Sequence, residues 1–301
     1  MHVIILCEVT MSRYLDPKID LVFKRIFGEH PHILKSFLNA VLPLPEDALI
    51  DHLEYLPSEQ VPAIPSFKNT ITDVKCTDKQ GRVFIVEMQI QWTASFMQRL
   101  LFGASTAYVR QLNKGEAYET LQPVYGLGLV DAIFDQKTAN WYHHYKLTHT
   151  ADNEKHLDDI QLLFIELPKF RATSFTQKKL QALWLRFMSE LNDKTDQVPS
   201  EWLEVPEIQA AVYLAEEASY SRGELEFCDT YWASVSNQRS FIVDATKEGV
   251  AKGKAEGKAE GKAEGIGLSL KVMALIKQGY DDMTIANETG LDAAVIAPFR
   301  E

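Results

Sequence analysis

The pattern of apolar and polar positions changes period within the first third of the chain. Over residues 17–41, apolar side chains recur at steps of three and four, which predicts a helix with a break near 29–31. Over residues 70–92 the step shortens to two, which predicts a β-hairpin. The residues between its strands, 78–81, are Asp, Lys, Gln and Gly, which favour a turn. The pattern therefore predicts helix followed by an antiparallel pair of strands.

The predicted hairpin carries acidic side chains on one face. Because side chains alternate along a strand, Glu87, Gln89 and Gln91 share one face, and the opposite face is apolar, with Val86, Met88 and Ile90. Pairing the strands symmetrically about the turn places Asp73 opposite Glu87. Two carboxylates that face each other across a strand pair repel unless a positive charge lies between them. A hard divalent cation, which prefers oxygen ligands, is the obvious candidate.

The segments after the hairpin complete an α/β pattern. A helix is predicted over 93–113, with Lys114 and Gly115 as its basic last turn and its C-cap. An edge strand is predicted within 49–55, and three further strands are predicted over 124–134, 141–147 and 160–167. A hairpin that leads through a helix into further strands predicts a mixed sheet with helices on its faces.

The last part of the chain is predicted to be helical, with one interruption. Helices are expected over 175–191, 205–222 and 225–240. Residues 252–265 then repeat the unit Lys-Ala-Glu-Gly, in which Lys and Glu are offset by two or six positions and form no i,i+4 pairs. Each glycine costs about 1 kcal/mol against alanine in a helix. We therefore expect a flexible linker, and the alternative is a helix that a partner stabilises along its glycines.

The C-terminal tail is expected to form a small helical unit over 268–277, 283–289 and 293–299. Residues 285–291 resemble the first helix and turn of a helix-turn-helix. The helix that would read DNA, 292–300, lacks the basic and amide side chains that contact base edges. We therefore expect a packing or oligomerisation unit in preference to a DNA reader.

Composition and charge restrict the class of protein. The hydrophobic content of 46% is ordinary for a globular chain, and the formal net charge of −11 counts against nucleic-acid binding. Cys7, Cys76 and Cys228 are too widely spaced for a zinc site or a disulfide framework, which suits a reducing cytoplasm. No apolar run reaches the length of a membrane span. We expect the protein to start at Met11, with a short N-terminal strand as the alternative.

The acidic hairpin resembles the active-site hairpin of the PD-(D/E)XK nuclease superfamily. Asp73, the turn and Glu87-Met88-Gln89 carry this resemblance. The segment 14–28, YLDPKIDLVFKRIFG, and Arg99 on the helix after the hairpin make it more specific. This order is similar to that of the Rpn group, the recombination-promoting nucleases that are also labelled transposases, and the similarity covers about residues 11–300.

The resemblance implies a fold and a division of the chain. The expected fold is an α/β restriction-endonuclease-like core, with a mixed sheet flanked by helices and an α-helical C-terminal lobe and tail. The expected parts are the nuclease-like core at 11–170, a helical lobe at 171–245, the repeat linker at 246–265, and the helix-turn-helix-like tail at 266–301.

The resemblance also implies a metal site. Asp73 and Glu87 are expected to bind Mg²⁺ or Mn²⁺, and Mg²⁺ needs only one or two carboxylates because it keeps several waters. Asp20 matches the acidic residue of the family's first helix and is expected to add a ligand, either directly or through water. Read from its residues alone, Asp20 fits a solvated helix face equally well.

The superfamily's lysine, two residues after the glutamate, is replaced here by Gln89. Glutamine can orient a water molecule through hydrogen bonds, but it carries no positive charge. The missing cation must come from elsewhere, and the candidates are Lys75, Lys24 and Arg99. Lys75 follows Asp73 by two residues and is expected on the same strand face.

The leading functional hypothesis is a Mg²⁺-dependent DNA endonuclease that promotes recombination, with Asp73, Glu87, Gln89, Asp20, Arg99 and Lys75 in its catalytic site. It would be a cytoplasmic protein that binds DNA and forms a homo-oligomer through its repeat and tail. One alternative is a nuclease-fold assembly module that has lost catalysis, which the net charge and the missing lysine favour. A second alternative is a regulated nuclease used in phage defence.

Overall fold

The computed structural model describes residues 13–57, 59–60, 70–71, 73–171 and 179–300 of the chain. The expected start at Met11 and the possible N-terminal strand lie outside these residues. The chain divides into two compact units, Met1–Val235 and Ser236–Glu301, which are described separately. Within the described residues, no helix is both long and apolar enough to cross a bilayer.

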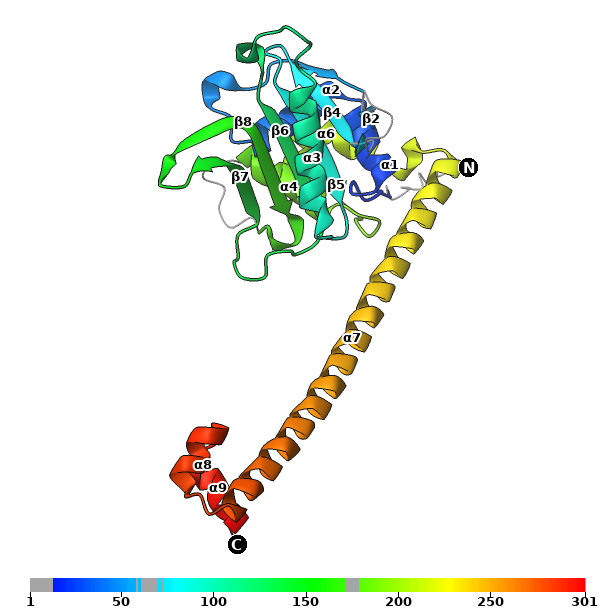
Figure 1. The fold of residues 1–301 in the computed structure, drawn as a ribbon. Helices are drawn as coiled ribbons and strands as arrows, with labels where there is room; N and C mark the ends of the chain where they lie inside the picture. The colour runs from blue at the N-terminus through cyan, green and yellow to red at the C-terminus, as the bar shows by residue number, and fades with distance from the viewer. Residues whose placement is uncertain (1–12, 58, 61–69, 72, 172–178, 301) are drawn as a thin grey trace, which may run out of the picture. The chain divides into compact units, whose positions relative to one another are not determined.

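The first unit is built on a mixed six-stranded sheet (Figure 1). Its strands follow the order β1-β4-β5-β6-β8-β7, where β4 pairs with its neighbours in antiparallel fashion and β5, β6 and β8 run parallel. The strands are β1 (Leu53–Tyr55), β4 (Val74–Asp78), β5 (Val83–Gln89), β6 (Val124–Val130), β7 (Tyr142–His149) and β8 (Asp152–Glu166). The predicted mixed α/β sheet is therefore confirmed, and the predicted edge strand within 49–55 is β1.

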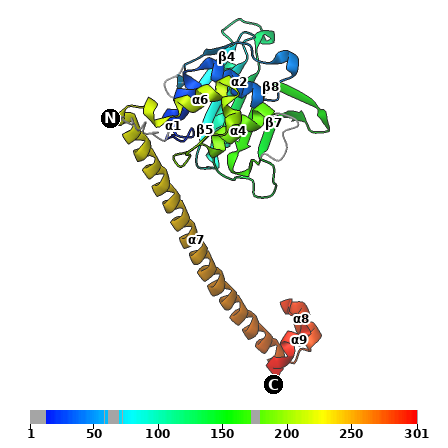
Figure 2. The ribbon, with the colours of Figure 1, turned by 180° about the vertical axis from the view of Figure 1, so that it is seen from behind.

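The N-terminal helix and the helical lobe cover one face of this sheet. Figure 2 shows α2, α4 and α6 together on this side. The elements are α1 (Asp20–Phe23), a π-helical turn (Lys24–Gly28), α2 (Pro31–Val41), α4 (Lys179–Glu190), α5 (Ser200–Leu203) and α6 (Pro206–Leu214). The largest buried side chains include Trp184, Trp202, Phe27 and Phe37, and they form one continuous core with the sheet. The predicted break near residue 29 lies between the π-helical turn and α2.

Helix α3 (Ser95–Val109) covers the opposite face (Figure 1). It lies close to β6 at two glycines, because a Cβ on Gly128 would be 2.8 Å from Cε1 of Phe96, and a Cβ on Gly126 would be 3.2 Å from Cγ of Leu100. Any larger residue at Gly128 would displace α3 and the side chains it carries. The sequence pattern extended this helix to residue 113, but it ends at Val109, several residues before the left-handed Gly115 (φ +93°).

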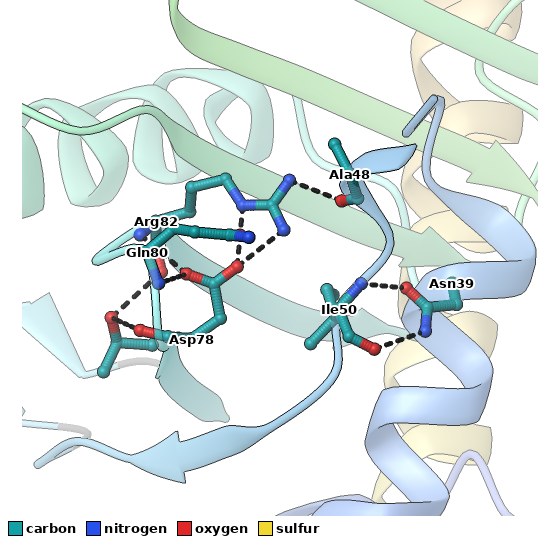
Figure 3. Close-up of polar contacts among 7 residues, drawn as sticks. Asn39, Ala48, Ile50, Asp78, Gln80 and Arg82 are labelled. Atoms are coloured by element: carbon teal, nitrogen blue, oxygen red, sulfur yellow. Dashed lines mark hydrogen bonds and ion pairs between the residues drawn. The ribbon is translucent and has the colours of Figure 1, made fainter. Parts of the chain in front are cut away.

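The hairpin at the centre of the sequence pattern differs from the prediction in its first strand. This strand is interrupted, so that β3 (Thr70–Ile71) pairs with β2 (Glu59–Gln60) in a separate two-stranded sheet, and β4 starts at Val74. The turn between β4 and β5 is held by a buried pair, Asp78 and Arg82, and the Arg82 guanidinium also donates to the carbonyl oxygen of Ala48 (Figure 3). The hairpin is thereby tied to the loop before β1.

The helices from α6 onward differ from the predicted ones, and the repeat is more regular than expected. Helix α6 ends at Leu214, short of the predicted residue 222, and is followed by a 3-10 turn (Glu217–Ser219). Helix α7 then runs without a break from Arg222 to Lys277 and includes the whole Lys-Ala-Glu-Gly repeat. The expected flexible linker is therefore helical in the structure. The expectation of no i,i+4 pairs also fails at the first lysine, because Nζ of Lys252 lies 3.8 Å from a carboxylate oxygen of Glu256.

The second unit ends in a small helical cluster. Helix α8 (Asp282–Thr289) is capped by Asp281, ends at the left-handed Gly290 (φ +71°), and is followed by α9 (Ala293–Ile296) and a 3-10 turn (Ala297–Arg300). Its buried side chains come from α7, α8 and α9, namely Val272, Ile285 and Ile296. The predicted short tail helices are confirmed, with the first one belonging to α7.

Candidate active site

The candidate site lies where β4 and β5 meet, at the carboxyl end of β5. The register pairs Val74 with Val86, and Asp73 and Glu87 are the residues that follow this pair at the end of the hairpin. Asp73 lies in a bend just before β4, because the strand is interrupted there. Its Oδ2 accepts a hydrogen bond of 2.7 Å from the backbone N–H of Met88, which fixes the carboxylate beside β5.

Glu87 is the most enclosed acidic group of the site. Only 4% of the residue is exposed, since β4 and β6 flank β5 on both sides. One carboxylate oxygen, Oε2, lies 3.6 Å from Nε of Arg99. The other, Oε1, is buried and has no hydrogen-bond partner among the described residues. A buried charged oxygen without a partner is costly, so this atom marks a place where the protein lacks a cationic or hydrogen-donating group.

Burial and mutual repulsion perturb both carboxyl groups. Burial, together with the charge of the neighbouring Asp73 and against the opposing effect of Arg99, raises the pKa of Glu87 to about 7. Burial also raises the pKa of Asp73, against the hydrogen bond from Met88, and Asp20 adds to the rise. Without a cation the pair therefore holds a proton close to neutral pH. Carboxyl groups of this kind, enclosed and close together, occur at catalytic and metal-binding sites.

Arg99, on the first turns of α3, provides a positive charge beside Glu87 and also acts on Asp73 through its charge. Its guanidinium packs over the Phe96 ring at 5.0 Å and donates a 2.6 Å hydrogen bond from Nη2 to Oε1 of Gln89. The amide Nε2 of Gln89 in turn donates to the carbonyl oxygen of Gln91. Gln89 therefore retains one N–H and one acceptor lone pair with which to contact a water molecule or a substrate.

The three other predicted residues occupy different positions. Asp20 opens α1, forms an i,i+4 ion pair of 2.8 Å with Lys24, and acts on Asp73 through its charge. Lys24 also acts on Asp73 electrostatically and lowers its pKa. Lys75 is half-buried, and its pKa is lowered by burial and by the charge of Arg110. The structure therefore brings Lys24 and Arg99 toward the acid pair, and places Lys75 beside Arg110.

Two further features near the site were missed in the sequence pattern. Asp16 and Lys18 form a buried ion pair of 3.1 Å, and the pKa of Asp16 is raised by burial and by the charge of Asp131 at the end of β6. Tyr231 on α7 lies within electrostatic reach of Asp20, Asp73 and Asp16. No pattern in the sequence predicts that residue 231 lies near residue 73. The spacing of Asp16 and Lys18 can be seen in the sequence, but it does not indicate a function.

The acid pair fits a divalent cation on the chemistry of its donors. Hard cations bind carboxylate oxygens, and Oε1 of Glu87 is an oxygen of this kind with no hydrogen-bond partner in the part of the chain that the structure describes. Among the described residues, no group of three or more His, Cys, Asp or Glu side chains is arranged to hold a metal. The fit is therefore to a cation that needs two carboxylates and completes its coordination with water, as Mg²⁺ does.

Comparison with protein families gives one match. The model of the PD-(D/E)XK nuclease family transposases matches residues 17–242, about three quarters of the chain and almost all of the first unit. No curated protein and no solved structure matches the chain. The matched segment contains the acid pair, Gln89 and Arg99, in an α/β fold with a mixed sheet and flanking helices. The chain therefore belongs to the PD-(D/E)XK nuclease family transposases.

Proposed function

We propose that this protein is a Mg²⁺-dependent DNA endonuclease, able to use Mn²⁺ in place of Mg²⁺, that makes breaks which promote recombination. Family membership supports a nuclease-type hydrolase with DNA as its substrate. The observation that carries the proposal is the buried, unpartnered Oε1 of Glu87 beside Asp73. An enclosed carboxylate kept without a partner weakens the fold, and such groups persist where function requires them.

The carboxylates of Asp73 and Glu87 would hold the cation, which supplies an activated water and neutralises charge on the phosphate. Met88 keeps the Asp73 carboxylate in place through its backbone N–H. Arg99 has its side chain 45% exposed, so its guanidinium can contact a phosphate oxygen while it remains close to Glu87. The proposal assigns the missing positive charge to Arg99 beside Glu87, with Lys24 as a second cation that acts on Asp73 through its charge.

Gln89 is proposed to position water or substrate with the donor and acceptor capacity that Arg99 and Gln91 leave free. It cannot act as a general base, so the proton released by the attacking water must pass to solvent or to a substrate oxygen. The contact between Gln89 and Arg99 thus partly compensates for the positive charge that is lost when glutamine replaces the usual lysine.

A homo-oligomer that forms through α7 and the tail is part of the same proposal. The repeat segment is helical, although it contains a glycine at every fourth position, and a Cβ at any of these glycines would meet nothing within 4 Å. Each glycine weakens an isolated helix by about 1 kcal/mol relative to alanine. A second copy packed along this segment would supply the contacts that the helix lacks.

The test is cleavage of a supercoiled plasmid in Mg²⁺ against EDTA. Wild type should nick or linearise the plasmid only with the metal. Asp73→Ala and Glu87→Ala should each lower the rate by at least about 1000-fold, since both remove a metal ligand. Asp51→Ala is the matched control, because Asp51 forms an exposed ion pair with Lys79 at the opposite end of the hairpin. Wild-type rates in folded Asp73→Ala protein, checked by circular dichroism, would overturn the proposal.

A catalytically inactive assembly module is the second candidate. It is favoured by the engagement of both polar ends of Gln89 and by the net charge of −11. It predicts no metal-dependent cleavage by wild type, and an oligomer that is lost when the chain is truncated at Phe241. Size-exclusion chromatography of this truncation measures assembly independently of cleavage.

A further inference from the structure

The first turns of α7 belong to the nuclease unit, although the helix continues far beyond it. The compact first unit extends to Val235, and the family match extends to residue 242. Cys228 and Val235 are buried, with 2% and 7% of each residue exposed. The other side chains on this face are partly buried against the main core and follow at helical spacing, namely Leu225, Tyr231 and Trp232. Residues 222–235 therefore pack on the core.

Two contacts attach these turns to the segments that carry the candidate site. Gln91 lies just beyond the end of β5, and its Nε2 donates a 3.1 Å hydrogen bond to the carbonyl oxygen of Val235. Arg25 lies 3.7 Å from a carboxylate oxygen of Glu224 and packs over the ring of Tyr220. Gln91 follows Gln89 by two residues, and Arg25 is the neighbour of Lys24. The helix is thus held against both the hairpin and the π-helical turn.

Between these two contacts lies Tyr231. Its ring stacks on Phe227 and contacts Trp232, which fixes its direction. Burial and the charges of Asp20, Asp73 and Asp16 raise the pKa of the Tyr231 hydroxyl to about 12. Tyr231 follows Glu224 by seven positions and precedes Val235 by four, so it lies on the same side of the helix as these two contact residues. Its hydroxyl is a neutral hydrogen-bond donor at neutral pH. Among the described residues it has no hydrogen-bond partner, unlike the Tyr142 hydroxyl, which donates to the carbonyl oxygen of Val41.

We propose that Tyr231 completes the active site from α7, where its hydroxyl donates a hydrogen bond to a phosphate oxygen of the DNA. This proposal rests on the proposed nuclease function. Carboxylates repel a phosphate, and Arg99 and Lys24 are the cations that act on the acid pair, so a further hydrogen-bond donor from α7 has a physical use. A phenol supplies this donor without competing with a cation for Asp73 and Glu87.

Tyr231→Phe tests this proposal, because it keeps the ring packing and removes only the hydroxyl. A hydrogen bond to a charged group accounts for about a 10- to 100-fold difference in kcat/KM for plasmid cleavage. We expect a loss of this size with an unchanged melting temperature. Tyr142→Phe is the matched control, since it removes a half-buried hydroxyl from β7 and should leave cleavage unchanged.

A second measurement separates this proposal from the nuclease assignment. Fluorescence anisotropy of a labelled short DNA duplex in Ca²⁺ reports phosphate binding without turnover. Weaker binding and slower cleavage by Tyr231→Phe than by Tyr142→Phe support the role of Tyr231. Equal values for the two variants, with an active wild type, overturn the role and leave the nuclease assignment intact. A wild type that neither binds nor cleaves DNA overturns both.

Discussion

Two buried carboxylates of the same hairpin have opposite surroundings. Asp78, at the turn, is 8% exposed, and Glu87, at the far end of β5, is 4% exposed. Both carboxylate oxygens of Asp78 have partners: Oδ1 accepts from the backbone N–H groups of Gln80 and Arg82, and Oδ2 accepts from Nε of Arg82 and lies 2.7 Å from its Nη2 (Figure 3). At Glu87, by contrast, Oε2 lies near Arg99, and Oε1 has no hydrogen-bond partner among the residues that the structure describes.

The difference distinguishes a buried carboxylate that stabilises the fold from a buried carboxylate that does not. Burial of a charge is tolerated where hydrogen bonds and an opposite charge compensate for it, as they do at Asp78. Glu87 lacks this compensation, and a cation bound from solvent would provide it. Removing the two carboxylates should therefore change stability in opposite directions, while only one of the changes affects cleavage.

The largest change in stability is expected for Asp78→Ala. The variant leaves the Arg82 guanidinium buried without its counter-charge, which typically costs about 3 to 5 kcal/mol. Urea denaturation should show a clear fall in the midpoint, and plasmid cleavage by the remaining folded protein should be retained. A midpoint equal to that of Asp51→Ala, which removes an exposed ion pair, would contradict this assignment.

Glu87→Gln should stabilise the protein above neutral pH. The folded pKa of about 7 lies above the ordinary 4.5, so between these values the folded state keeps a proton that the unfolded state has lost. The unfolding free energy of wild type therefore falls as pH rises through this range. Glutamine removes the effect, so the variant should be more stable by up to about 3 kcal/mol near pH 8 in EDTA. Below the unfolded pKa the difference should vanish, and a less stable variant near pH 8 would contradict the account.

Arg99→Gln should lower kcat/KM by about 10- to 100-fold, because it removes the cation proposed to contact the phosphate. It also removes the charge that opposes the rise in the Glu87 pKa, so the acid limb of the pH–rate profile should move to higher pH. Arg99→Lys keeps the charge and should recover part of the rate. An acid limb that stays in place in Arg99→Gln would show that this side chain does not act on Glu87.

Lys75→Met should have the smallest effect, with cleavage within about threefold of wild type. The Lys75 ammonium is half-buried beside Arg110, and neither acid of the pair appears among the charges that shift its pKa. The comparison with Arg99→Gln at one pH identifies the residue that supplies the missing charge. A loss with Lys75→Met as large as that with Arg99→Gln would return this role to Lys75.

The parts of the site that could be predicted from sequence are those set by the strand period. Alternation and turn position placed Asp73 opposite Glu87; the observed register reaches Val74 and Val86, one position short of the two acids, and the backbone N–H of Met88 donates to Asp73. The same rule placed Lys75 on the face of Asp73, but Asp73 lies in a bend before β4, where alternation does not apply. The contact between Asp78 and Arg82 was missed because an i,i+4 pair across a turn leaves no periodic signal.

Long-range features lay outside the reach of local patterns. Helix α7 continues through the repeat, although local propensity favours a linker there. Tyr231 packs against a core formed by residues far away in sequence. Such contacts depend on tertiary packing.

Mg²⁺ binding measured by isothermal titration calorimetry tests the central claim most directly, because it reports on the acid pair without requiring turnover. Wild type should bind the metal with an affinity that falls as pH decreases below about 7, since a proton competes for the same carboxyl groups. Binding should release protons, which buffers of different ionisation enthalpy reveal. Glu87→Gln, folded and at least as stable, should show no binding heat. Binding to Glu87→Gln with the affinity of wild type would contradict the account.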